Sequence, residues 1–257
     1  VQELVNEENG RSGDWASESR FDNPVTRDIL TKLQEAKAEG ILDITPGTDG
    51  NADHLLAMAG QLSSFTVDSS GAASTVAGVI EGTVAAEDLK EELGVELPPG
   101  LKLDLNMDAG PYPGVDAAGR GQVGGLVWYM SNTVPPEQQA AAWDFMKFNN
   151  SVEAQVQWGI DGSTAPISKA AADDPALQEA WSSTLGGQWV KVAYDVLAGI
   201  DTEFPGPVIG PYDEVRVAIE KAMDQVLLDD GDIDAAVVEA DATITAALES
   251  YRQDVGA

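Results

Sequence analysis

The chain has no cysteine and a single histidine, His54. Without cysteine there are no disulfides, no thiolate nucleophiles and no zinc-thiolate sites. A single imidazole also argues against a histidine metal centre and against Ser-His-Asp catalysis, in which a histidine stands between a serine and an acid. We therefore expect neither a metal nor another cofactor, and we expect His54 to be an ordinary helix residue.

Basic residues are also scarce. The 257 residues include 14 Lys and Arg against 44 Asp and Glu, which gives a net charge of −30. A field of this sign repels phosphate backbones and anionic lipids, so we expect no nucleic-acid or membrane-surface partner. No apolar run approaches the roughly 20 residues that a membrane span needs. The hydrophobic fraction of 43% is enough for a core, in one large domain or two small ones.

Helical periodicity covers much of the chain. Asn23 and Pro24 form a start signal for a helix that should end at Gly40. A short helix is expected over 55–60, and short strands over 63–68 and 126–130 complete an α/β pattern. Further helices are expected to begin at Pro136, Val152, Pro175, Asp213 and Ile233, and the glycine pair Gly186-Gly187 is a candidate break in the third of these.

Two stretches have the spacing of ligand sites. Residues 119–124 match the G-x-G-x-x-G spacing of dinucleotide-binding loops, but that fingerprint needs a strand before it and a helix after it. Here Pro and Gly precede it and an apolar strand follows, so we interpret it as a connecting loop. The aspartates between 230 and 241 resemble a calcium loop, but Ala235 stands where the turn needs glycine. We interpret them as an interhelix turn and N-caps.

Most of the tryptophans fall on helical faces, where core packing is expected. These are Trp143, Trp158, Trp181 and Trp189. Trp128 and Tyr129 differ, because they follow a glycine pair on a short strand whose successive side chains point to opposite faces. Either one of the two rings faces a cleft, where aromatic rings bind the apolar faces of sugars, or both are simply buried.

Four segments, in order along the chain, resemble a known family. They are LLAMAGQLSSFTVDSSGA, GGLVWYMS, AAAWDFMKFNNSVEAQVQWGIDGSTAPISKAA and GPYDEVRVAIEKAMDQVL. They are similar to the extracellular solute-binding proteins of carbohydrate ABC transporters, and most of all to binders of glycerol 3-phosphate and glycerophosphodiesters. The chain departs from the family pattern at residues 60–64 and at Ser163, where an aromatic residue often follows the glycine. The identity of the ligand therefore stays open.

The resemblance implies an α/β fold of the periplasmic-binding-protein-like type II, with two lobes that close on a ligand by a hinge. Residues 1–120 would belong to the second, C-terminal lobe, 121–174 to the first lobe, and 175–257 again to the second. Family members begin with a lipoprotein or secretion signal and most of the first lobe. The chain starts at Val1 with neither, so we expect the C-terminal portion of a longer periplasmic or cell-surface protein, with the N-terminal lobe largely missing.

By the same correspondence, eight residues are expected to line the cleft between the lobes. These are Ser69, Ser70, Gly124, Gly125, Trp128, Gly162, Tyr212 and Arg216. Serine hydroxyls and glycine N–H groups can bind ligand hydroxyls or phosphate, the two aromatic rings can stack on the ligand, and the guanidinium suits an anionic group. The alternative for Arg216 is a surface ion pair with Glu220, one helical turn further on.

The function that the resemblance implies is that of a monomeric, extracytoplasmic substrate-binding component of an ABC importer. It would bind a sugar, a polyol or a glycerol phosphate, deliver it to a membrane permease and catalyse no reaction. Two other classes stay open. A glycoside hydrolase would need two facing carboxylates about 5 to 9.5 Å apart, which no motif selects here. A protein-interaction domain would use the acidic helices as its contact surface.

Overall fold

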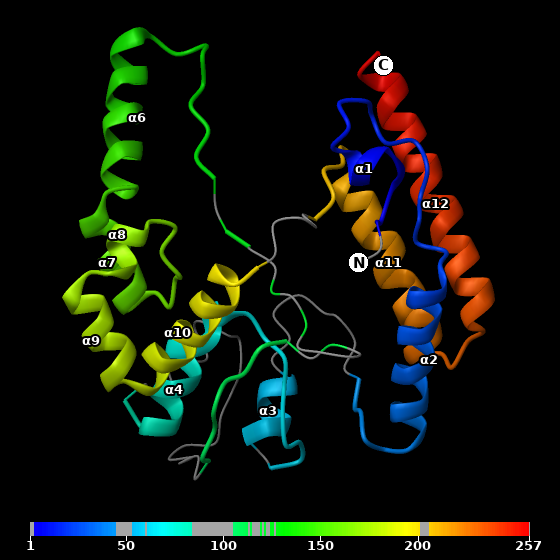
Figure 1. The fold of residues 1–257 in the computed structure, drawn as a ribbon, viewed down its shortest axis with the longest axis horizontal. Helices are drawn as coiled ribbons and strands as arrows, with labels where there is room; N and C mark the ends of the chain where they lie inside the picture. The colour runs from blue at the N-terminus through cyan, green and yellow to red at the C-terminus, as the bar shows by residue number, and fades with distance from the viewer. Residues whose placement is uncertain are drawn as a thin grey trace. The chain divides into compact units, whose positions relative to one another are not determined.

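The computed structural model describes residues 3–44, 53–59, 61–83, 105–112, 114, 119, 121, 124–125, 127–200 and 206–256. Helices dominate these residues (Figure 1). The chain forms two compact units, Val1–Thr48 with Asp201–Ala257, and Asp49–Ile200. We call the first the terminal unit, because it contains both ends of the chain, and the second the central unit. The division into receptor lobes at residues 120 and 174 stays a prediction.

The terminal unit is built from α1 (Asn6–Gly10), α2 (Pro24–Ala38), α11 (Tyr212–Leu227) and α12 (Ile233–Asp254). Two of these helices begin at a side-chain cap. Asn23 Oδ1 accepts a hydrogen bond from the Thr26 N–H at 2.9 Å, and Asp232 Oδ1 accepts one from the Ala235 N–H at 2.8 Å. Such caps satisfy first-turn N–H groups that have no acceptor inside the helix. The helix predicted from Asn23 and Pro24 is confirmed.

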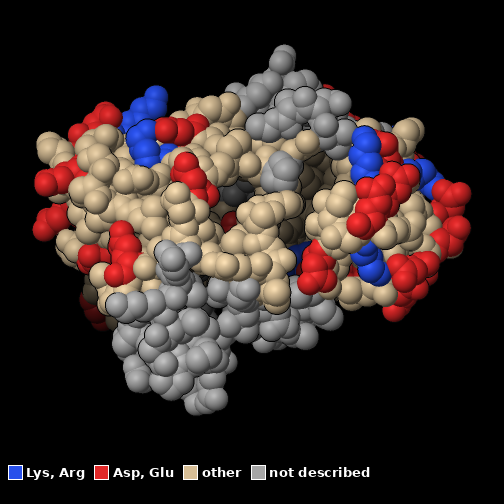
Figure 2. All heavy atoms as spheres, turned by 90° about the horizontal axis from the view of Figure 1, so that it is seen from below, with Lys and Arg blue, Asp and Glu red and all other residues tan. Residues whose placement is uncertain are grey.

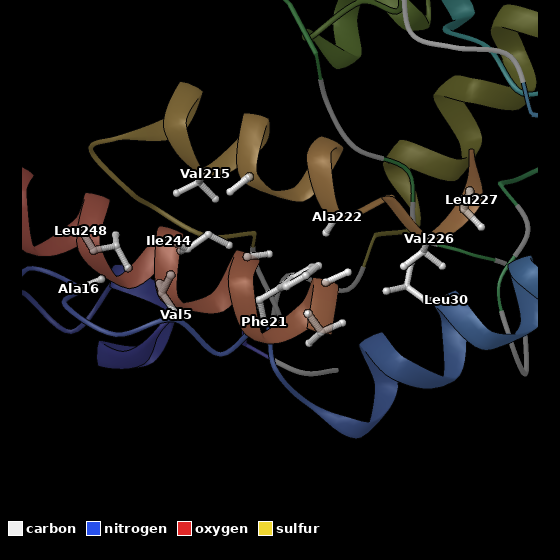
Figure 3. Packing of buried hydrophobic residues seen from close by; sticks show 14 residues of the cluster. Val5, Ala16, Phe21, Leu30, Val215, Ala222, Val226, Leu227, Ile244 and Leu248 are labelled. Atoms are coloured by element: carbon white, nitrogen blue, oxygen red, sulfur yellow. The ribbon is translucent and has the colours of Figure 1, made fainter. Parts of the chain in front are cut away.

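The core of the terminal unit lies between α2, α11 and α12, which pack against one another. Figure 3 shows Leu30 of α2 beside Val226 of α11, with Ile244 of α12 in the same apolar layer. The side chains of Val226 and Ile244 are fully buried, and burial of a side chain of this size contributes about 1.5–3 kcal/mol. Val5 and Phe21 complete the layer, so the N-terminal segment is held against the C-terminal helices.

The central unit contains a 3-10 helix, η1, and several α-helices. They are α3 (Asp53–Ala59), η1 (Ser70–Ala72), α4 (Ala73–Glu81), α6 (Pro136–Asn149), α7 (Val152–Asp161), α8 (Lys169–Ala172), α9 (Pro175–Ser183) and α10 (Leu185–Ala198). α10 packs against α4 and α9, around the buried residues Ala77, Leu177, Trp181 and Val190. The helix predicted to begin at Val152 is confirmed, and Ser151 caps it, because its Oγ accepts a hydrogen bond from the Ala154 N–H at 3.2 Å.

Thr184 ends α9 and begins α10. Its Oγ1 donates to the Ala180 carbonyl oxygen at 3.0 Å and accepts from the Gly187 N–H at 3.0 Å. One hydroxyl therefore adds a second hydrogen bond to a carbonyl in the last turn of α9, which also accepts from the Thr184 N–H at 3.2 Å, and caps an N–H in the first turn of α10. The candidate break in this helix is confirmed, and it falls just before the glycine pair rather than within it.

The prediction of an α/β fold is wrong. Residues 63–68 and 127–130 form no β-ladder, and residue 126 lies outside the described residues. In the described ranges the strand-like pairing is an isolated bridge between Val5 and Ser19, with no sheet. A strand needs a neighbour that satisfies its N–H and C=O groups, and neither segment has one among the residues that the structure describes. The side chains of Val127 and Tyr129 are accordingly exposed instead of buried.

The tryptophans divide between buried and exposed positions. Trp181 and Trp189 lie in the core of the central unit, as predicted. The prediction is wrong for Trp143 of α6 and Trp158 of α7, whose side chains are 54% and 57% exposed. α6 contains no buried residue, because its described neighbours, α7 and the ring of Trp128 beside Phe145, cover its apolar side chains only in part.

Most of the basic side chains on the described surface take part in ion pairs. Figure 2 shows acidic side chains spread over the described surface, with fewer basic ones among them. Lysines commonly lie beside an acid, as in the pairs of Lys32 with Asp28, Lys37 with Asp230 and Lys191 with Asp195. Exposed pairs of this kind contribute little stability, about 0–1 kcal/mol each. Within the described ranges, no helix combines the length and apolarity that crossing a membrane would take.

Candidate functional site

Ser163 joins the loop after α7 to the start of α4. Its hydroxyl donates to Ser74 Oγ at 2.5 Å and accepts from the Ser74 N–H at 2.9 Å. Ser163 is only 2% exposed and has a φ of 53°, in the left-handed region that non-glycine residues rarely occupy. The Ser74 N–H belongs to the first turn of α4 and has no acceptor inside that helix, so a distant side chain serves as its cap. This contact fixes the loop that contains Gly162.

Ser69 caps the short 3-10 helix η1 that leads into α4, and Ser70 is the first residue of that helix. Ser69 Oγ accepts from the Gly71 N–H at 3.2 Å, and the Ser69 N–H donates to Asp68 Oδ1 at 2.6 Å. The hydroxyl and the N–H of Ser70 form no hydrogen bond with any other described residue. Ser69 is therefore occupied in shaping the turn, and Ser70 offers a donor and an acceptor to a ligand. We call Ser69, Ser70, Ser74 and Ser163 the serine cluster.

The ring of Trp158 lies beside Gly162. The Gly162 N–H donates to the Trp158 carbonyl oxygen at 2.9 Å, and a Cβ at Gly162 would come within 3.1 Å of Trp158 Cε3. Glycine at this position lets the loop approach the indole closely. Because Trp158 is more than half exposed, it presents an aromatic surface next to a loop that the serine cluster fixes.

His54 of α3 also contacts this region. Its Nε2 lies 3.0 Å from Asp68 Oδ2, while the other carboxylate oxygen of Asp68 accepts from the Ser69 N–H. Asp68 thus connects α3 to the turn at Ser69. His54 lies in a helix, as predicted, and it also helps to position the serine cluster.

Gly124, Gly125 and Trp128 form a second group in the central unit. Both glycines are exposed, and a Cβ at either would meet no atom within 4 Å. Trp128 is 52% exposed and its ring meets Phe145 of α6 edge to face, with 5.3 Å between the ring centroids. Among the described residues, no hydrogen bond connects this group to the serine cluster or to Gly162.

Tyr212 and Arg216 belong to the terminal unit. They lie one turn apart at the start of α11, and the Tyr212 side chain is 53% exposed. Arg216 Nε lies 3.8 Å from Glu220 Oε1, and both side chains are well exposed. The surface ion pair considered for Arg216 is therefore present, and an (i, i+4) pair of this kind contributes only about 0.2–0.5 kcal/mol.

The acidic residues near α12 have structural partners. Asp232 caps α12, Asp230 pairs with Lys37 at 2.8 Å, and Asp241 Oδ1 accepts from the Asp22 N–H at 2.9 Å. The interpretation as an interhelix turn and an N-cap is confirmed. No group of three or more potential metal ligands occurs within the described ranges. Of the dinucleotide-like stretch, residues 120, 122 and 123 lie outside the described residues.

The shifted pKa values lie away from the serine cluster. A hydrogen bond from Lys221 lowers the pKa of Glu239, and the hydrogen bond to Asp22 raises the pKa of Arg27. Both residues are in surface ion pairs of the terminal unit. A general acid of a glycoside hydrolase needs a carboxyl group whose pKa is raised, which is the opposite of the shift at Glu239.

Trp158, Ser74 and Ser163 are functional candidates that the sequence did not select. Ser163 looked like the replacement of an aromatic residue and not like a structural contact, because its partner Ser74 lies far away in the sequence. Trp158 precedes Gly162 by four residues, which is about one turn of a helix. This spacing alone could have predicted that the indole lies beside the glycine.

One comparison with known proteins gives a match. A family model described as bacterial extracellular solute-binding protein matches residues 6–184, which is more than half of the chain. The matched range includes the serine cluster, Trp128, Trp158 and Gly162, but not Tyr212 and Arg216. A search of curated proteins found no match.

Proposed function

The chain belongs to the bacterial extracellular solute-binding proteins, and from this we propose that it captures a sugar, a polyol or a glycerol phosphate for an ABC importer. Members of this family bind solutes outside the cytoplasm for transport, and their function is generally not catalytic. The carbohydrate or glycerol-phosphate ligand and the ABC permease partner are the proposed parts.

The serine cluster with Trp158 is the observation that carries the proposal. Ser70 offers a hydroxyl and an N–H without a partner among the described residues, and Trp158 offers a half-exposed indole beside Gly162. Polyhydroxylated ligands need both kinds of contact, because their hydroxyls form hydrogen bonds and their C–H faces lie on aromatic rings. The two hydrogen bonds between Ser74 and Ser163 hold these groups in place before a ligand arrives.

Five further residues supply contacts in the proposal. Gly124 and Gly125 leave space for close approach of a ligand to the backbone, and Trp128 provides a second half-exposed indole. In the terminal unit, Tyr212 and Arg216 present a phenol ring and a guanidinium one turn apart on α11. Because the ion pair with Glu220 is long and exposed, Arg216 can exchange this partner for a ligand phosphate at little cost.

Calorimetric titration with a panel of maltose, glycerol and glycerol 3-phosphate tests this function. We expect saturable, stoichiometric binding of one class and no conversion of the ligand. Ser70→Ala and Trp158→Leu should each weaken binding about fivefold or more, which corresponds to about 1 kcal/mol. Ser182→Ala and Trp143→Leu are matched controls, because both side chains are exposed and the Ser182 hydroxyl is bonded within α9, to the Glu179 carbonyl oxygen. Hydrolysis of a glycoside, or equal effects of the site and control variants, would contradict the proposal.

A further inference from the structure

A pocket of about 260 Å³ lies within the terminal unit. It lies between the segment after α1, the loop before α11 and the C-terminal part of α12. Its main lining residues are Asp14, Trp15, Ala16, Val208, Leu248 and Tyr251, and we call it the Trp15 pocket. Its volume is below the roughly 300–1,000 Å³ of sites for drug-sized molecules, so a small ligand fits it.

Hydrogen bonds connect the two sides of the Trp15 pocket, which are the segment after α1 and the loop before α11. The Val208 N–H donates to the Asn9 carbonyl oxygen at 3.0 Å, and Arg11 Nε donates to the Gly206 carbonyl oxygen at 2.9 Å. Gly10, with a φ of 76°, lies so close to Val208 that a Cβ would overlap its carbonyl oxygen. A Cβ at Gly210 would overlap the Tyr251 ring in the same way. The pocket is therefore formed in advance by contacts that only small residues permit.

Aromatic rings form its walls and aliphatic side chains its floor. Trp15 and Tyr251 meet edge to face, with 5.5 Å between the ring centroids and 60° between the planes. The Trp15 side chain is 48% exposed, whereas Ala16 and Leu248 are buried. An edge-to-face pair leaves part of the electron-rich face of one ring open to a ligand, and this is the surface that attracts cations.

The charge at the rim is negative. The Asp14 side chain is exposed, and its carboxylate has no hydrogen-bond or ion-pair partner among the described residues. Arg11 is the nearest basic residue along the chain, and its Nε is bound to Gly206. In a chain with a net charge of −30, this unpaired carboxylate beside two aromatic rings favours a cation over a neutral or anionic ligand.

We propose that the Trp15 pocket binds a small organic ammonium ion, with the alkyl groups against Trp15 and Tyr251 and the charge toward Asp14. The three contributions are distinct. The rings attract the cation through their negative faces, Ala16 and Leu248 accept apolar groups, and Asp14 offsets the charge. The lining of the pocket is distinct from the proposed solute site, because it includes neither Tyr212 nor Arg216 and no member of the serine cluster.

Choline and its uncharged carbon analogue, dimethylbutanol, test the proposal on the full chain at low salt. The two molecules have nearly the same shape, so their difference in affinity measures recognition of the charge. Calorimetry and the indole N–H signal of Trp15 in a nitrogen-proton NMR spectrum report binding and location. We expect saturable choline binding that shifts the Trp15 signal, and binding of the analogue weaker by about fivefold or more. Absence of saturable choline binding, or equal affinities for both molecules, would overturn the proposal.

Variants separate a specific site from general attraction to an acidic surface. Asp14→Asn and Trp15→Leu should each weaken choline binding about fivefold or more. Asp43→Asn makes the same charge change at another exposed carboxylate of the terminal unit, and Trp143→Leu makes the same ring deletion outside it. Both controls should leave choline binding unchanged. Trp15→Phe keeps an aromatic ring at this position and should retain choline binding. It therefore tests the role of the ring even where Trp15→Leu unfolds the segment. Equal losses in Asp14→Asn and Asp43→Asn would mean that only surface charge attracts choline.

Discussion

Ser163 and Ser74 are 89 residues apart in the sequence and share two hydrogen bonds, at 2.5 and 2.9 Å between the donor and acceptor atoms. This pair keeps the loop after α7 in contact with the first turn of α4. Because Ser163 is buried, the Ser74 N–H cannot exchange it for water without opening the loop.

Removing the Ser163 hydroxyl should destabilise the protein. Ser163→Ala leaves the N–H and hydroxyl of Ser74 without their partner, and the expected loss is about 1–3 kcal/mol in the free energy of unfolding. Urea denaturation measures it. Ser182→Ala, at an exposed serine of α9, is the control and should change stability by less than about 0.5 kcal/mol. Equal values for the two variants would mean that the buried pair contributes nothing.

Arg216 should discriminate between anionic and neutral ligands. Arg216→Ala is expected to weaken glycerol 3-phosphate binding about tenfold or more, since a hydrogen bond to a charged group contributes about 1.5–3 kcal/mol. Binding of a neutral sugar should change little, and calorimetry with both ligands measures the difference. Arg252→Ala removes the same charge from the exposed end of α12 and serves as the control. An equal loss for both ligands would remove the phosphate role from Arg216.

The exposed aromatic residues of α6 should bind hydrophobic dyes and promote self-association of the chain. Trp143, Phe145 and Phe148 are 54%, 53% and 60% exposed, on a helix without a buried residue. Large exposed apolar surfaces of this kind mark interaction sites or lead to association. Changing Phe145 and Phe148 to Ser should lower the fluorescence of a bound hydrophobic dye and reduce self-association in sedimentation velocity. Gln138→Ser, on the same helix, should change neither signal. An unchanged dye signal in the double variant would show that α6 is covered in solution.

The ion pair between Lys221 and Glu239 should give a measurable pH effect. The hydrogen bond from Lys221 lowers the pKa of Glu239 below its ordinary value of 4.5. A group whose folded pKa is lowered adds stability above its unfolded pKa, and this stability is lost as the pH falls through the folded value. Lys221→Gln should return the pKa of Glu239 toward 4.5 in an NMR titration of the carboxyl signal. Lys32→Gln, which disrupts a different exposed pair, should leave it unchanged.

Helix positions were predictable because their signals are local. Asn23 and Ser151 each accept a hydrogen bond from an N–H three residues further on, so a short stretch of sequence contains the whole cause. The strand predicted over 126–130 failed for the opposite reason. A run such as Val127 to Met130 fits a strand only when another segment pairs with it, and sequence periodicity does not reveal whether that partner is there.

The candidate sites depended even more on distant contacts. The family resemblance selected Ser69, Ser70 and Gly162, which lie on segments that the structure joins through Ser74 and Ser163. No local pattern connects those two serines. The Trp15 pocket was equally hidden, because Trp15 and Tyr251 come from opposite ends of the chain and meet only when the N-terminal segment packs against α12.

The double role of Thr184 sets the rotational register of α10. Because α9 ends and α10 begins at this single residue, there is no loop to absorb a change in length. One inserted residue would rotate every following side chain of α10 by about 100° about the helix axis. Gln188 would then take the buried place of Trp189, Trp189 would have to fit the smaller place of Val190, and Val190 would leave the core of the central unit. This junction should therefore tolerate substitution far better than insertion, although it lies between two helices, where changes in length are usually accepted.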